Sequence, residues 1–205
     1  MKKGIIQIFL VVLIVILSVV LVKSILEPIQ FKKEQKHRYG IVVQNLKDIR
    51  TAQLAYKDVY GMFTGSLDTL TNFVKTDSLQ LIYKKGEIPE DLLGQITERE
   101  AIDKGMIIRD TIRIAVLDSL FGKEYPIDSL RYIPFSGGKE YRMAQGEVIT
   151  GSKLKVKVFE AKAPSKYILK GLDEQAIINL NDGWEYQGLK VGSLEEANNA
   201  AGNWE

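Results

Sequence analysis

The chain has few residues of the types that perform acid–base, nucleophilic or metal chemistry. His37 is the only histidine, and it lies in a basic stretch, FKKEQKHRYG, directly after a long apolar segment. We therefore expect neither a histidine-based triad nor a histidine metal cluster. The chain has no cysteine, which excludes disulfides, thiolate catalysis and cysteine metal sites.

Neighbouring carboxylates are the next candidates for chemistry, since a pair of them can act as general acid and general base. Such pairs occur at Asp173 with Glu174 and at Glu195 with Glu196. Adjacent charges on surface helices usually face solvent, so we expect no catalytic role for either pair. The sequence thus predicts a protein that is not an enzyme, and an envelope enzyme with an unrecognised site is an open alternative.

Two short stretches partly match ligand-binding loops. Residues 137–139, Gly-Gly-Lys, would need a glycine at the position of Ile133 and a serine or threonine at that of Glu140 to form a phosphate loop. Residues 181–183, Asn-Asp-Gly, would need an oxygen ligand at the position of Ile178 to form a calcium loop. We therefore predict no cofactor, no metal site and no small-molecule substrate.

The apolar segment covers residues 5–22 and contains only two polar side chains, Gln7 and Ser18. At 1.5 Å per residue such a helix is roughly 27 Å long, about the thickness of a bilayer's hydrocarbon core. A cleaved signal has a shorter apolar region and a small-residue cleavage site, which KSILEP after Val22 does not offer. We expect a short basic tail at 1–4, a transmembrane helix at 5–26 and a juxtamembrane stalk at 27–40, with the lipid bilayer as a partner.

Basic residues flank the apolar segment on both sides, so the positive-inside rule gives a mixed answer. The start MKK, followed at once by an apolar run, resembles a signal anchor. We therefore expect a single-pass protein of the bacterial inner membrane with its soluble domain, 41–205, in the periplasm. The net charge of +2, with 26% charged residues, argues against a nucleic-acid partner.

Beyond Pro28, where we expect a kink or a restart of the helix, apolar side chains recur at helical spacing as far as Tyr60. This spacing predicts an amphipathic helix that ends at Gly61. Its packing face comprises Val42, Leu46, Ile49, Ala52 and Tyr56.

The remainder of the soluble domain mixes helical and strand patterns. Ser66 begins a short helix, and a capping box at Thr97 begins another. From Thr111 onward, alternating segments predict antiparallel strands, including a hairpin at 176–188, and Ser193 begins a last short helix. The predicted fold is α+β, with an N-terminal transmembrane helix that extends into an amphipathic helix packed on an antiparallel β-sheet.

Three aromatic residues near the C-terminus, Trp184, Tyr186 and Trp204, are candidates for a contact surface. The alternative is that these side chains cover the core of the domain.

The stretch AQLAYKDVYGMFTGSLDTL, residues 52–70, resembles the end of the long helix in type IV pilins and in the pseudopilins of type II secretion. That family commonly has the pattern A-x-x-A-Y-x-x-x-x-G-x-Y/F, which Ala52, Ala55, Tyr56, Gly61 and Phe63 match. The resemblance implies a long helix that continues into a globular domain and packs on a β-meander.

The start of the chain adds to this resemblance, because pilins have a short basic leader that a membrane peptidase removes after a glycine. Here the cut would fall between Gly4 and Ile5. Most members carry a glutamate five residues after the cut, where this chain has Phe9, as in some tip pseudopilins. As a whole, the chain resembles short, single-span membrane proteins of Bacteroidota with no assigned function.

Two functions therefore stand beside the enzyme alternative. The first is a membrane-anchored, non-enzymatic envelope protein that presents an α+β domain for binding other envelope proteins. The second is a pilin-like or pseudopilin-like structural subunit of a secretion or pilus-type assembly, which associates with its own copies through the N-terminal helix. Removal or retention of residues 1–4 distinguishes them.

Overall fold

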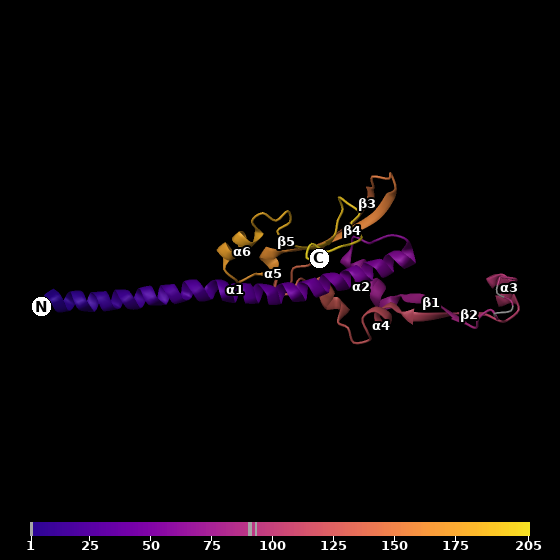
Figure 1. Ribbon diagram of the computed structural model, residues 1–205, viewed down its shortest axis with the longest axis horizontal. Helices are drawn as coiled ribbons and strands as arrows, with labels where there is room; N and C mark the ends of the chain where they lie inside the picture. The colour runs from indigo at the N-terminus through magenta and orange to yellow at the C-terminus, as the bar shows by residue number, and fades with distance from the viewer. Residues whose placement is uncertain (1, 90–91, 93) are drawn as a thin grey trace. The chain divides into compact units, whose positions relative to one another are not determined.

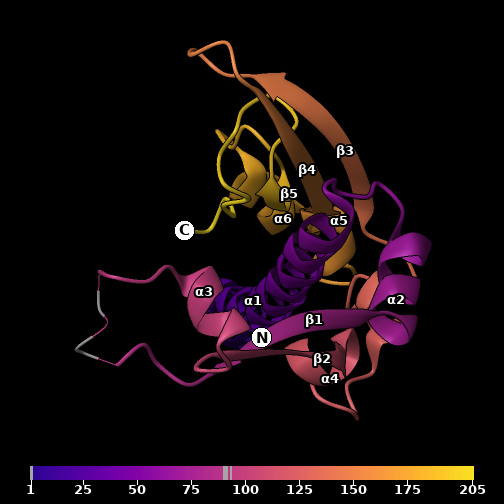
Figure 2. The same ribbon diagram turned by 90° about the vertical axis from the view of Figure 1, so that its right-hand side faces the viewer.

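The computed structural model describes residues 2–89, 92 and 94–205, which form two compact units (Figures 1 and 2). Unit 1 contains the residues up to Arg50 together with Tyr132–Glu205, and unit 2 contains Thr51–Arg131. The domain bounds expected from the sequence, with a soluble domain at 41–205, stay a prediction. The long helix α1, Lys2–Tyr60, passes from unit 1 into unit 2.

Helix α1 has 59 residues and includes Pro28 without an interruption (Figure 1). The expected restart of the helix at this proline is wrong. Proline removes only its own hydrogen bond, to the carbonyl four residues earlier, and the turns on either side keep theirs. The apolar segment and the packing face therefore belong to one helix, while a kink at Pro28 stays a prediction.

Unit 1 is built on an antiparallel sheet of order β3–β4–β5. Its strands are β3, Arg142–Ile149, β4, Lys155–Pro164, and β5, Gly188–Gly192; the helices α5, Ser165–Ile168, and α6, Glu174–Asn181, lie between β4 and β5 in the chain. The core joins the inner residues of the sheet, such as Phe159 and Val191, to Leu46 of α1. The α+β fold with a long N-terminal helix packed on an antiparallel sheet is thus confirmed.

Unit 2 contains a two-stranded antiparallel ribbon and several short helices. The ribbon pairs β1, Ser78–Lys85, with β2, Ile108–Ala115. The helices are α2, Leu67–Thr76, α3, Glu98–Asp103, α4, Val116–Leu120, and the 3-10 helix η2, Ile127–Arg131. Ser66 caps α2 and Thr97 forms the predicted capping box with Glu100, so both predicted helix starts are confirmed.

Two predicted elements of the C-terminal region are wrong. The hairpin expected at 176–188 is instead helix α6, because Asp173 caps it by accepting a hydrogen bond from the Ala176 N–H at 2.6 Å. The helix expected from Ser193 does not form, although the Ser193 Oγ accepts from the Glu195 N–H at 3.2 Å. The chain there is bent through a residue at φ +53°, Asn199, which is incompatible with a helix.

Gln53 is a buried polar residue that the periodicity of α1 did not single out. Its side chain donates to the Thr64 carbonyl at 2.6 Å and accepts from the Thr64 N–H at 3.1 Å, and the residue is fully buried. It therefore ties the loop after α1 back to the helix within unit 2.

We expect Gln53→Leu to lower the free energy of unfolding by about 2 kcal/mol or more, because it leaves both buried backbone groups of Thr64 unpaired. Denaturant unfolding of the full chain in detergent, followed by circular dichroism, measures the change. Gln44→Leu is the control, since Gln44 is exposed and bonds only its neighbour Asp48. Equal stability of the two variants would contradict the role of Gln53.

Candidate functional site

The part of α1 that precedes its packed half is exposed from Phe9 onward. Every residue from Phe9 to Gln30 is exposed, and most of them are large and apolar. Among the described residues, one helix is long and apolar enough to cross a membrane, and it is this one, near the N-terminus. Gly4 lies within α1. The structure does not describe Met1 or the side chain of Ile5, so cleavage of the leader between Gly4 and Ile5 stays a prediction.

The predicted packing face of α1 is buried in both units. In unit 1, Val42, Leu46 and Ile49 are fully buried. In unit 2, Ala52 is fully buried, whereas Tyr56 is half-buried and packs edge-on against Phe73 with ring centroids 5.1 Å apart. The same helix is therefore exposed and apolar in its first half and a core element in its second.

The region 27–40, expected as a solvated stalk, is packed along one side. Arg38 donates to the carbonyls of Ile168 and Lys170 at 3.3 and 3.0 Å, and its guanidinium lies 4.9 Å from the centre of the Phe135 ring. The Tyr39 hydroxyl is 2.7 Å from the Ser165 Oγ, and burial raises the pKa of Tyr39. These contacts fix α5 and the following loop to α1.

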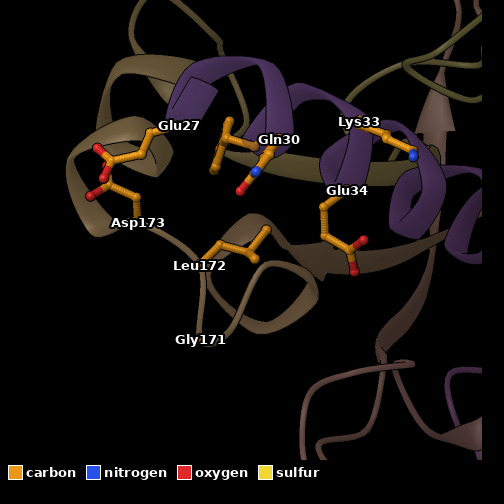
Figure 3. A pocket seen from close by; sticks show the side chains of 8 residues that line it. Glu27, Gln30, Lys33, Glu34, Gly171, Leu172 and Asp173 are labelled. Atoms are coloured by element: carbon orange, nitrogen blue, oxygen red, sulfur yellow. The ribbon is translucent and has the colours of Figure 1, made fainter. Parts of the chain in front are cut away.

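A cleft of about 650 Å³ lies between α1 and the loop 171–173, directly after the apolar segment (Figure 3). Figure 3 shows Glu27 and Asp173 at one end of this cleft and Glu34 toward the other. A hydrogen bond from the Arg38 Nε, 2.8 Å long, lowers the pKa of Glu34. The cleft joins the carboxyl end of the apolar segment to the loop that leads into α6.

A second cavity, of about 450 Å³, is basic and contains one of the predicted contact aromatics. Arg142, Lys162 and Lys166 line it together with Tyr186. The Lys162 Nζ lies 5.3 Å from the centre of the Tyr186 ring and 2.6 Å from the Glu160 Oε1. Burial raises the pKa of Tyr186 to about 12.

The other two predicted aromatics lie elsewhere in unit 1. Trp184 follows α6 and is 47% exposed. Trp204 is half-buried next to Glu205, whose carboxylate accepts from Arg50 at 2.7 Å. Of the three aromatics, Tyr186 alone lines the basic cavity, and Trp184 is the most exposed.

The folded protein favours the neutral phenol of Tyr186, so its pKa is higher in the folded chain than the ordinary value near 10. The contribution of Tyr186 to the free energy of unfolding is therefore fully present below about pH 10 and is lost as the pH rises toward 12. We therefore expect Tyr186→Phe to weaken the loss of stability between about pH 10 and pH 12. Denaturant unfolding across this range measures it. The control is Trp184→Phe, which replaces a neighbouring aromatic side chain that does not titrate. Its stability should depend on pH in the same way as that of the original chain. An identical alkaline profile for the two variants would contradict the burial of the phenol.

The carboxylate pairs and the histidine occupy ordinary structural positions. Asp173 is the cap of α6, Glu174 lies in its first turn, and Glu195 and Glu196 are exposed. His37 is exposed beside Phe135, with ring centroids 6.3 Å apart. Within residues 2–89, 92 and 94–205, no three acidic or histidine side chains are grouped so that they could hold a metal ion.

No known protein family, curated protein or solved structure matches this chain. The resemblance to pilins, the bacterial source and the absence of catalysis therefore stay predictions.

Proposed function

We propose that the protein is a single-span membrane protein of the bacterial inner membrane that presents its folded units in the periplasm, where they bind other envelope proteins. One observation carries the proposal. From Phe9 to Gln30, α1 exposes apolar side chains on every side, while one face of its second half is buried in the core. Water disfavours so large an apolar surface, and a bilayer is the environment that removes it.

The continuity of α1 explains why the anchor and the folded part would act together. No break separates the exposed segment from Val42 and Leu46, which are fully buried in unit 1. Arg38 and Tyr39 add hydrogen bonds between α1 and the segment around α5. The anchor therefore holds unit 1 close to the bilayer surface rather than on a long, free stalk.

A membrane-impermeant maleimide tests the side of the membrane on which unit 1 lies. The chain has no cysteine, so Ile149→Cys gives one reactive thiol at a position that is 65% exposed. We expect this thiol to react in intact cells whose outer membrane has been permeabilised. If it reacts only after the inner membrane is lysed, the folded units are cytoplasmic and the proposed orientation is wrong.

A pilin-like subunit is the second candidate, and the arrangement of unit 1 favours it. A long helix with an exposed apolar first half and a second half packed on a three-stranded antiparallel sheet matches what the resemblance implies. In that case the apolar half of α1 would pack against other copies after leaving the membrane. The two candidates differ in the fate of residues 1–4.

A further inference from the structure

Helix α6 carries large apolar side chains, and the fold covers them only in part. Three of its eight residues are large aliphatics. Ile178 is exposed, Ile177 and Leu180 are half-buried, and no residue of α6 is fully buried. Ile178 is 62% exposed, and Trp184, which follows the helix, is 47% exposed. We call these four residues the α6 surface.

The cleft shows that the start of α6 lies beside α1 just beyond the end of the apolar segment, measured along the axis of α1. Asp173, the cap of α6, lines the cleft together with Glu27 (Figure 3). Glu27 is five residues, roughly 7.5 Å of helix, beyond Val22. In Figure 1, α6 lies nearer to the N-terminal end of α1 than the other labelled elements of unit 1.

Exposed apolar side chains of α1 continue to this same level. Ile25, Leu26 and Ile29 are all exposed and lie around Glu27 on the helix. If the bilayer covers the apolar part of α1, its headgroup region, several ångströms thick on each side, must reach α6. The α6 surface is then continuous with the surface that the membrane already covers.

We propose that α6 and Trp184 lie in the headgroup region of the bilayer that α1 crosses, as a second contact between unit 1 and the membrane. An in-plane helix buries its apolar side chains at the boundary between headgroups and acyl chains, where tryptophan is also enriched. Four carboxylates, at Glu27, Glu34, Asp173 and Glu174, are matched in number by four cations of α1, the exposed Lys32, Lys33 and Lys36 and the Glu34 partner Arg38. The contact therefore rests on apolar burial and does not need anionic lipid.

This inference rests on the proposed anchor, and an experiment with three single-cysteine variants separates the two. Ile178→Cys probes α6, Leu21→Cys probes the apolar segment, and Ile149→Cys is the control, since it is 65% exposed at the end of β3 that points away from the N-terminus (Figure 1). Each full-length variant carries an environment-sensitive fluorophore on its thiol. It is reconstituted into phosphatidylcholine vesicles with or without a lipid that bears a nitroxide near its headgroup.

We expect strong quenching at residue 21 and roughly threefold more quenching at residue 178 than at residue 149. Equal quenching at 178 and 149, with strong quenching at 21, would overturn the inference and leave the anchor intact. Weak quenching at all three would overturn both. A blue-shifted emission at 178 that the nitroxide lipid does not quench would mean that protein, such as a second copy of the chain, covers α6, and it would also overturn the inference.

Discussion

Replacing Leu46 by aspartate is expected to lower the free energy of unfolding of unit 1 by about 4 kcal/mol or more. Leu46 of α1 is fully buried in unit 1, as are Val42 and Ile49 on the same face of the helix. The substitution removes a large apolar side chain and places a carboxylate at a fully buried position. Because a domain's total stability is only about 5–15 kcal/mol, most of the molecules could unfold.

Tryptophan fluorescence during denaturation of the full chain in detergent measures this effect, since Trp184 and Trp204 both lie in unit 1. The matched control is Leu54→Asp on the same helix, where the leucine is 43% exposed and the expected change is small. If Leu46→Asp unfolds like the original chain, the second half of α1 is a free stalk and the packing described here is wrong.

The pair Ile14→Arg and Val15→Arg is expected to abolish stable membrane insertion. Each arginine at the centre of a transmembrane helix costs about 2.5–3.5 kcal/mol in insertion, so the pair costs about 6 kcal/mol. The fraction of protein that stays in membranes after carbonate washing measures the loss.

The control for this pair is Ile149→Arg with Leu154→Arg. These two aliphatic side chains are each 65% exposed near the turn between β3 and β4, and the variant adds the same charge. It should remain in the membrane fraction. If both pairs remain there, the apolar part of α1 does not hold the protein in a bilayer.

Strong local signals made much of the fold predictable from sequence. The helical spacing from Val42 to Tyr56 identified the buried face of α1, and the caps at Ser66 and Thr97 identified two helix starts. Each of these signals depends only on residues that are close in the chain, which is why they could be identified from the sequence alone. The fold class followed from their combination.

The errors arose where distant contacts decide the structure. The helix α6 is an exception, because its cap is local: the Asp173 carboxylate accepts from the Ala176 N–H three residues on, a signal that the strand interpretation of this segment overlooked. In contrast, Ser193 has the side chain of a helix start, but the Asn203 Oδ1 accepts from the Lys190 N–H at 3.0 Å and ties the tail to β5.

The candidate site was less predictable than the fold. Tyr186, Trp184 and Trp204 were selected for their aromatic character, but only the folded chain shows that Tyr186 lines a cavity whereas Trp184 is 47% exposed. The basic cavity around Tyr186 joins residues more than 40 positions apart, Arg142 and Tyr186, so no local pattern indicates it.

The most direct test of the central claim is the intact mass of the protein recovered from carbonate-washed native membranes. The account predicts that the protein stays in the washed membranes with residues 1–4 retained. A chain that begins at Ile5, especially with an added methyl group on its amino terminus, would contradict it and make the pilin-like subunit the better explanation. Release of the protein into the wash would contradict the anchor itself.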